Sequence, residues 1–151
     1  MFRKTKTQKR GGKYKNTRKN MSYNTFPEKI TIRFLEMLLM IKLYHWKTHS
    51  YATHKATDEL YSSLNENMDK FIEVLLGKTN SRLDLMKHKS IHLIDLNNHS
   101  VLITKIKSFK NELVDLDKTP FMKSMENTDL FNIRDEILGN LNQFLYLLTF
   151  K

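Results

Sequence analysis

The stretch that decides the fold is residues 53–76, THKATDELYSSLNENMDKFIEVLL. Its large apolar side chains recur at steps of three and four residues, which is the spacing of one face of an α-helix. These residues are Leu60, Tyr61, Leu64, Met68, Phe71, Ile72 and Leu75. Gly77 follows as the predicted end of the helix. The stretch therefore predicts a long amphipathic helix that buries this face against other elements.

The same periodicity predicts three further helices, at about 28–48, 99–117 and 127–149. With only 4 Gly and 2 Pro, the chain does not resemble a turn-rich β-sandwich. About twenty residues separate the second and third predicted helices, which is enough to cross the length of a bundle. Residues 81–89 are compatible with a short helical turn. The sequence therefore predicts an all-α four-helix bundle over residues 25–151, with a long crossover between its second and third helices.

The net charge of +10 comes from 26 Lys and Arg against 16 Asp and Glu, and it is unevenly placed. Residues 1–20 hold nine of the bases and no acid, so the rest of the chain has 17 bases and 16 acids. Residues 1–24 are poor in large apolar side chains, which predicts a disordered basic tail. Such a tail favours contact with DNA without sequence preference, although RNA, an acidic protein surface or a nuclear-localisation role fits the same charge. Its bases are Arg3, Lys4, Lys6, Lys9, Arg10, Lys13, Lys15, Arg18 and Lys19.

The absence of cysteine excludes several classes of protein. The chain has no disulfide, thiolate zinc site or iron–sulfur cluster, which fits an intracellular, reducing compartment. No apolar run reaches the ~18 residues of a membrane-spanning helix. The basic N-terminus lacks the apolar segment of a secretory leader. We therefore expect no membrane partner.

Two polar pairs on the second predicted helix are candidate metal ligands: His54 with Asp58, and Asp69 with Glu73. The second pair repeats the spacing of the first, eleven residues later, from Asp58 to Asp69. Eleven residues of α-helix rotate back to within about 20° of the starting direction and rise ~16 Å along the axis. One ion with ligand distances near 2 Å cannot touch both pairs within one chain. An antiparallel second copy, related by a two-fold axis near position 63.5, brings the two pairs together. The spacing therefore predicts a dimer with two equivalent sites.

Histidines near the end of the first predicted helix extend this candidate site. His45 can reach it across the short loop, and His49 is an alternative or additional imidazole. Imidazole and carboxylate ligands without thiolate suit Fe(II), Mn(II) or Zn(II). The competing interpretation is a solvated helix face with structural histidines. His88 and His92, which have no carboxylate pair nearby in sequence, are interpreted as structural or surface groups.

The sequence His45-Trp46, followed by His54-x3-Asp58 and Asp69-x3-Glu73, resembles the ferroxidase signature of the Dps family of DNA-protecting miniferritins. The resemblance implies a ferritin-like bundle and non-haem iron, mononuclear or di-iron, at a dimer interface. The ligands would be His45, His54, Asp58, Asp69 and Glu73, with Trp46 beside them. It further implies oxidation of Fe(II) by hydrogen peroxide or oxygen, iron storage in a dodecamer, and DNA contact through the tail.

The chain also departs from the family pattern. Nine residues separate His45 from His54 where the family usually has twelve, which puts the place of His45 in doubt and makes His49 a candidate. The shorter loop favours an alternative function, a structural or nucleoid-packaging protein without iron turnover. The expected DNA contact implies a nucleoid as the location. The Lys- and Asn-rich composition resembles proteins of large DNA viruses, which would instead imply a virion or an infected cell.

Overall fold

The computed structural model describes residues 25–150, so the predicted basic tail and its nine bases lie outside the described residues. These residues form only helices and connections, without a strand, which confirms the all-α prediction. The elements are α1 (Phe26–Lys47), α2 (Tyr51–Thr79), α3 (His99–Val114), the 3₁₀ helix η1 (Asp115–Lys118), α4 (Pro120–Lys123) and α5 (Thr128–Leu147). No helix in this part of the chain is long and apolar enough to span a bilayer.

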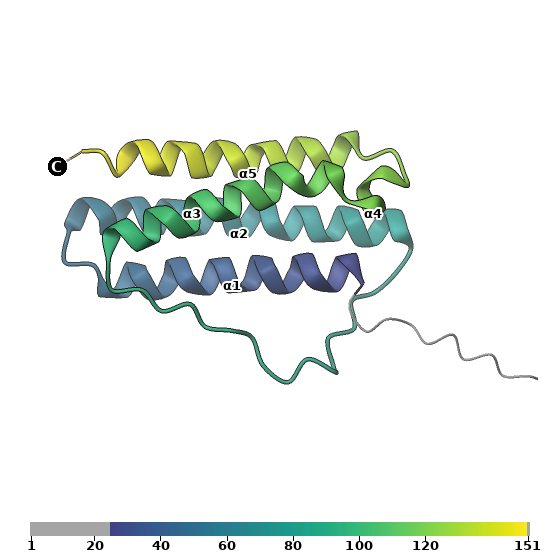
Figure 1. The fold of residues 1–151 in the computed structure, drawn as a ribbon, viewed down its shortest axis with the longest axis horizontal. Helices are drawn as coiled ribbons and strands as arrows, with labels where there is room; N and C mark the ends of the chain where they lie inside the picture. The colour runs from purple at the N-terminus through teal and green to yellow at the C-terminus, as the bar shows by residue number, and fades with distance from the viewer. Residues whose placement is uncertain (1–24, 151) are drawn as a thin grey trace, which may run out of the picture.

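Four long helices lie side by side (Figure 1). α1 and α5 run in one direction along the molecule, and α2 and α3 run in the other. Residues 80–98 contain no helix and lead from the end of α2 to the start of α3, at the opposite end of the molecule (Figure 1). α2 packs against both α1 and α5, so this helix joins the two sides of the structure.

The core is built from the apolar faces that the residue spacing predicts. On α2, Leu64, Phe71 and Leu75 are completely buried. Phe34 of α1 makes edge contacts with Phe71 and with Phe109 of α3, at centroid distances of 5.5 and 6.2 Å. Such aromatic contacts add to the free energy of apolar burial. Aromatic rings from three helices therefore meet in the middle of the core.

The end of α2 differs from the prediction. The helix continues through Gly77 to Thr79 and ends at Asn80, which adopts the left-handed conformation with φ of 45°. Asn is one of the few residues apart from Gly that adopt this conformation, and the Asn80 N–H donates to the carbonyl oxygens of Leu76 and Gly77. The prediction that Gly77 ends the helix is therefore wrong.

Two further boundaries need correction. Residues 81–89 form no helix, only a turn at 86–87. The third predicted helix ends at Val114 and tightens into η1, and Pro120 begins a further short helix, α4. A first-turn proline needs no N–H partner, and the Thr119 hydroxyl caps α4 by accepting from the N–H of Met122. Local capping chemistry, not periodicity, sets these ends.

We expect Phe71→Ala to lower the free energy of unfolding by about 3–5 kcal/mol, because it removes a completely buried ring and leaves a cavity. Urea denaturation followed by circular dichroism measures the change. Phe150→Ala is the control, since this ring is 58% exposed and its loss should cost less than about 0.5 kcal/mol. Equal losses for the two variants would contradict the assigned core.

Candidate metal site

The site begins where α1 and α2 are joined by only three residues, 48–50. This short connection places His45, in the last turn of α1, against His54 in the first turn of α2. The two imidazole rings stack with centroids 3.9 Å apart and planes inclined by 22°. His45 is only 7% exposed, so its ring is held inside the helix pair.

Each imidazole is bonded to the backbone of the other histidine. Nδ1 of His45 lies 3.0 Å from the carbonyl oxygen of His54, and Nδ1 of His54 lies 3.1 Å from that of His45. A carbonyl oxygen can only accept, so both Nδ1 atoms must carry the hydrogen. In the neutral rings both Nε2 atoms are then left with a free lone pair, the form in which histidine binds metals.

Thr57 strengthens the orientation of His45. The Thr57 hydroxyl is completely buried and donates to a backbone carbonyl of its own helix, at 2.8 Å from Thr53 or 2.9 Å from His54. The same oxygen lies 3.2 Å from Nδ1 of His45, where it accepts a hydrogen bond. A buried polar network that is fully paired in this way fixes the ring more firmly than one bond does.

Asp58 lies on the free side of this imidazole pair. Its Oδ1 is 3.9 Å from Nε2 of His45 and 3.8 Å from Nζ of Lys42, and its side chain is half exposed. The Lys42 ammonium also lies over the ring of Tyr61, 4.7 Å from its centroid, and 5.9 Å from that of Trp46. We call His45, His54 and Asp58 the imidazole–carboxylate cluster. It contains two imidazoles and one carboxylate.

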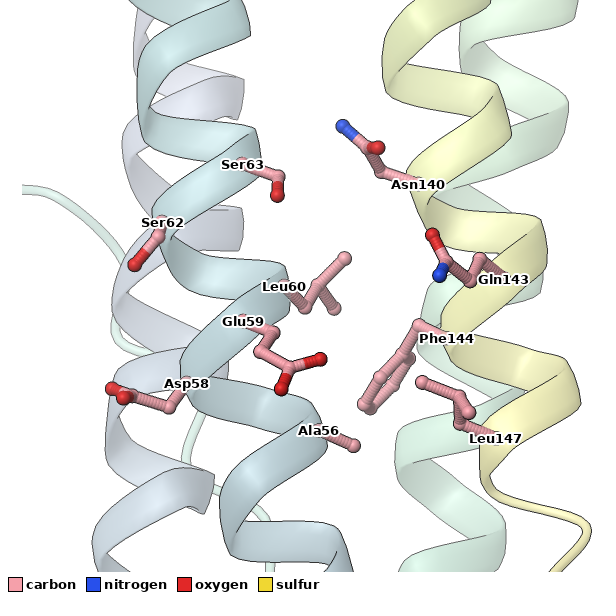
Figure 2. Close-up of a pocket in the computed structure, with 10 residues that line it drawn as sticks. All are labelled: Ala56, Asp58, Glu59, Leu60, Ser62, Ser63, Asn140, Gln143, Phe144 and Leu147. Carbon is pink, nitrogen blue, oxygen red and sulfur yellow. The ribbon is translucent and has the colours of Figure 1, made fainter.

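The carboxylate of Asp58 points away from α5 (Figure 2). Figure 2 shows the side chains of Asp58 and Ser62 on the side of α2 turned from α5, while Glu59 and Ser63 point toward α5 across a cavity. That cavity measures about 400 Å³. Asp58 and Ser62 are both exposed, and they lie at the rim of this cavity.

The second predicted pair stays apart from the first within one chain. Asp69 and Glu73 are exposed on α2, and even the nearest carboxylates of the two pairs, Asp58 and Asp69, are about 16 Å apart along the axis. In residues 25–150 no group of three or more His, Cys, Asp or Glu side chains is arranged to hold an ion. A single chain therefore carries two separate halves of the predicted ligand set.

The structure also separates the other histidines from the cluster. His49 is exposed and lines a different cavity, with Tyr44 and Leu96. Burial raises the pKa of the Tyr44 phenol, which therefore stays neutral. His88 and His92 lie on the helix-free connection between α2 and α3. His45, not His49, is the imidazole beside Asp58 despite the short loop.

Two residues that contact the cluster, Lys42 and Thr57, were not predicted from the sequence. Lys42 precedes His45 by three residues, so the helical period alone places both on one side of α1. Thr57 directly precedes Asp58 and gave no sequence signal, because a hydroxyl within a helix most often bonds to its own backbone.

Residues 45–148 match a family described as "Family of unknown function (DUF5856)". The chain belongs to this family. The matched residues begin at His45 and include all of α2, and therefore every ligand predicted from the sequence. No curated protein and no solved structure matches the chain.

We expect both cluster histidines to be Nδ1–H tautomers when neutral, because each Nδ1 faces a carbonyl oxygen. Long-range ¹H–¹⁵N correlation spectra of the imidazoles measure the tautomer directly. Thr57→Val should weaken this preference at His45 and leave His54 unchanged. An Nε2–H tautomer at either position in the unmodified chain would contradict the orientation described.

Proposed function

We propose that the chain is a Dps-like miniferritin subunit that binds and oxidises Fe(II) at a site shared by two copies. The observation that carries the proposal is the reciprocal bonding of His45 and His54, which leaves both Nε2 atoms unbonded, with that of His45 3.9 Å from Asp58. The helix directions and the long helix-free connection support a ferritin-like bundle with a crossover between α2 and α3.

A second copy supplies the missing carboxylates. If two α2 helices pack antiparallel about an axis near position 63.5, His54 meets Glu73 and Asp58 meets Asp69 of the other copy. Ser62 and Asn65 lie at the axis, and both are exposed in the single chain. Facing carboxylates repel unless a cation lies between them. A bound metal ion is such a cation, so the arrangement favours a metal-binding interface.

The ring geometry favours two ions over one. A metal ion lies in the plane of its imidazole, about 2 Å from the nitrogen. Planes inclined by only 22° and stacked at 3.9 Å do not meet that close to their nitrogens. Each imidazole would therefore hold its own ion, and the carboxylates of Asp58, Asp69 and Glu73 would supply the oxygen ligands. This supports the di-iron form of the site.

Iron is the substrate of the proposed reaction. Hydrogen peroxide accepts one electron from each of two Fe(II) ions and takes up two protons, giving two Fe(III) ions and two water molecules. Carboxylate oxygens are hard ligands that favour the Fe(III) product. Two-electron reduction also avoids release of hydroxyl radical. Oxygen is the alternative oxidant.

The basic tail extends the proposal to DNA. Nine bases without an acid displace counterions from phosphates and read no base edges, so the contact is independent of sequence. Iron oxidation beside bound DNA would consume peroxide where damage matters most. The alternative function, a packaging protein without iron turnover, keeps the tail contact and lacks the oxidation.

We expect His54→Ala and Glu73→Ala each to slow Fe(II) oxidation at least about ten-fold, because each removes one ligand of the shared site. After anaerobic loading with Fe(II), peroxide is added and ferric absorbance is followed. Glu136→Gln is the control, since this carboxylate lies on α5 and faces Lys70 at 4.0 Å. It should retain the unmodified rate within about two-fold.

Mixed dimers test whether the site is shared. The two variants are co-expressed with different affinity tags and the mixed dimer is purified. One of its two sites combines both defects and the other has every ligand, so we expect about half of the unmodified rate. A mixed dimer as slow as its parents would contradict a shared site. If the unmodified chain does not oxidise Fe(II), the ferroxidase proposal is rejected and the packaging function is the one that remains.

We expect removal of residues 1–20 to abolish binding to duplex DNA at physiological salt. For the full chain, the slope of log affinity against log salt should approach about −8 if all nine bases contact phosphates. Fluorescence anisotropy with two unrelated duplexes over a salt series measures both. A variant that keeps the full tail but carries glutamine at the nine basic positions shows whether the charge of the tail or its length supplies the DNA affinity. Unchanged affinity after removal would reject the tail as the DNA contact.

A further inference from the structure

Trp46 directly follows His45 and is the chain's single tryptophan. Its side chain is 68% exposed, although the residue adjoins the imidazole–carboxylate cluster. The Lys42 ammonium, which also contacts Asp58, lies 5.9 Å from the centroid of the indole ring. The indole therefore stands at the edge of the surface that carries Asp58. Exposed tryptophan is enriched at protein interfaces, where it dominates the binding free energy.

A groove lies farther along the same α1–α2 surface. It measures about 170 Å³, several times the ~30 Å³ share of one water molecule. Leu35 and Leu38 of α1 and Ile72 of α2 form apolar walls. Asn65 and Asp69 add side-chain oxygen atoms to the lining. The groove thus combines apolar walls with acceptors, which suits an indole ring and its N–H donor.

The two-fold axis inferred above relates the indole to this groove. Paired positions on the two α2 helices have residue numbers that add up to 127, as for 54 with 73 and 58 with 69. His45 contacts Thr57 of its own chain at 3.2 Å. Position 57 lies at the same level along the helix axis as position 70 of the second copy, which is the level of Asp69 and Ile72. Trp46, next to His45, therefore lies level with the groove of that copy.

We propose that Trp46 of each copy inserts into the groove of the other and anchors the dimer. The proposal rests on the two-fold site of the proposed function and adds the contact that holds it together. The occupant is a second copy because the axis that joins Asp58 to Asp69 also brings the indole to the groove. Two equal contacts result, as an isologous dimer requires.

Fluorescence of the full chain reads this contact directly, because Trp46 is the single tryptophan. Emission and acrylamide quenching are measured over a dilution series while sedimentation velocity gives the dimer fraction. Both are done with and without Zn²⁺, a redox-inert probe that accepts the same ligands. We expect dimer formation to shift emission to shorter wavelength and to reduce quenching several-fold.

Three variants define the contact. Trp46→Ala should raise the dissociation constant at least about thirty-fold, the usual cost of losing an anchoring tryptophan, without altering the fold of the single chain. Ile72→Glu should weaken the dimer and return Trp46 to full quenching. Val114→Glu is the matched control, because it adds the same charge on α3 at a side chain that is 49% exposed, and it should change neither readout.

The outcomes separate this proposal from the proposed function. A dimer in which Trp46 is quenched as fully as in the unfolded chain overturns the anchor, even if iron is oxidised. An unchanged dissociation constant for Trp46→Ala overturns it as well. A dimer with protected Trp46 that oxidises no iron supports the anchor and rejects the enzyme. A chain that stays monomeric with Zn²⁺ overturns both.

Discussion

The site depends on the exchange of hydrogen bonds between two histidines and each other's backbone carbonyls. The carbonyl of His45 lies in the last turn of α1, where backbone acceptors have no partner within the helix. The ring of His54 satisfies this acceptor and holds the start of α2 against the end of α1. Because both bonds use Nδ1, the contact that joins the helices also leaves both Nε2 atoms available.

This exchange explains how a short loop is compatible with the ligand pattern. Only residues 48–50 lie between α1 and α2, so the two histidines are brought close by the helix ends and not by a flexible segment. The Thr57 hydroxyl then fixes the His45 ring through its contact with Nδ1, and the Lys42 ammonium balances the negative charge of the Asp58 carboxylate. The short connection therefore still places His45 beside Asp58, while His49 lies at a different cavity.

The sequence predicted the helices because apolar spacing follows directly from burial, as at Leu64, Phe71 and Leu75. It failed at the end of α2, where the left-handed Asn80 decides the boundary, and at η1 and α4, where capping decides it. For the site, spacing placed the carboxylates on one face of α2. Spacing carries no information on ring orientation, so the tautomers and the role of Thr57 needed the folded structure.

The strongest competing interpretation is that Asp58, Asp69 and Glu73 form an ordinary solvated stripe. A solvated stripe needs no particular neighbours, yet this one borders an apolar groove at Asp69 and a largely exposed indole at Trp46. Apolar surface left open beside ordered ligands is typical of an interface. In the proposed dimer, one antiparallel partner would complete both the ligand set and the burial of this surface. We therefore favour the shared site over the solvated stripe.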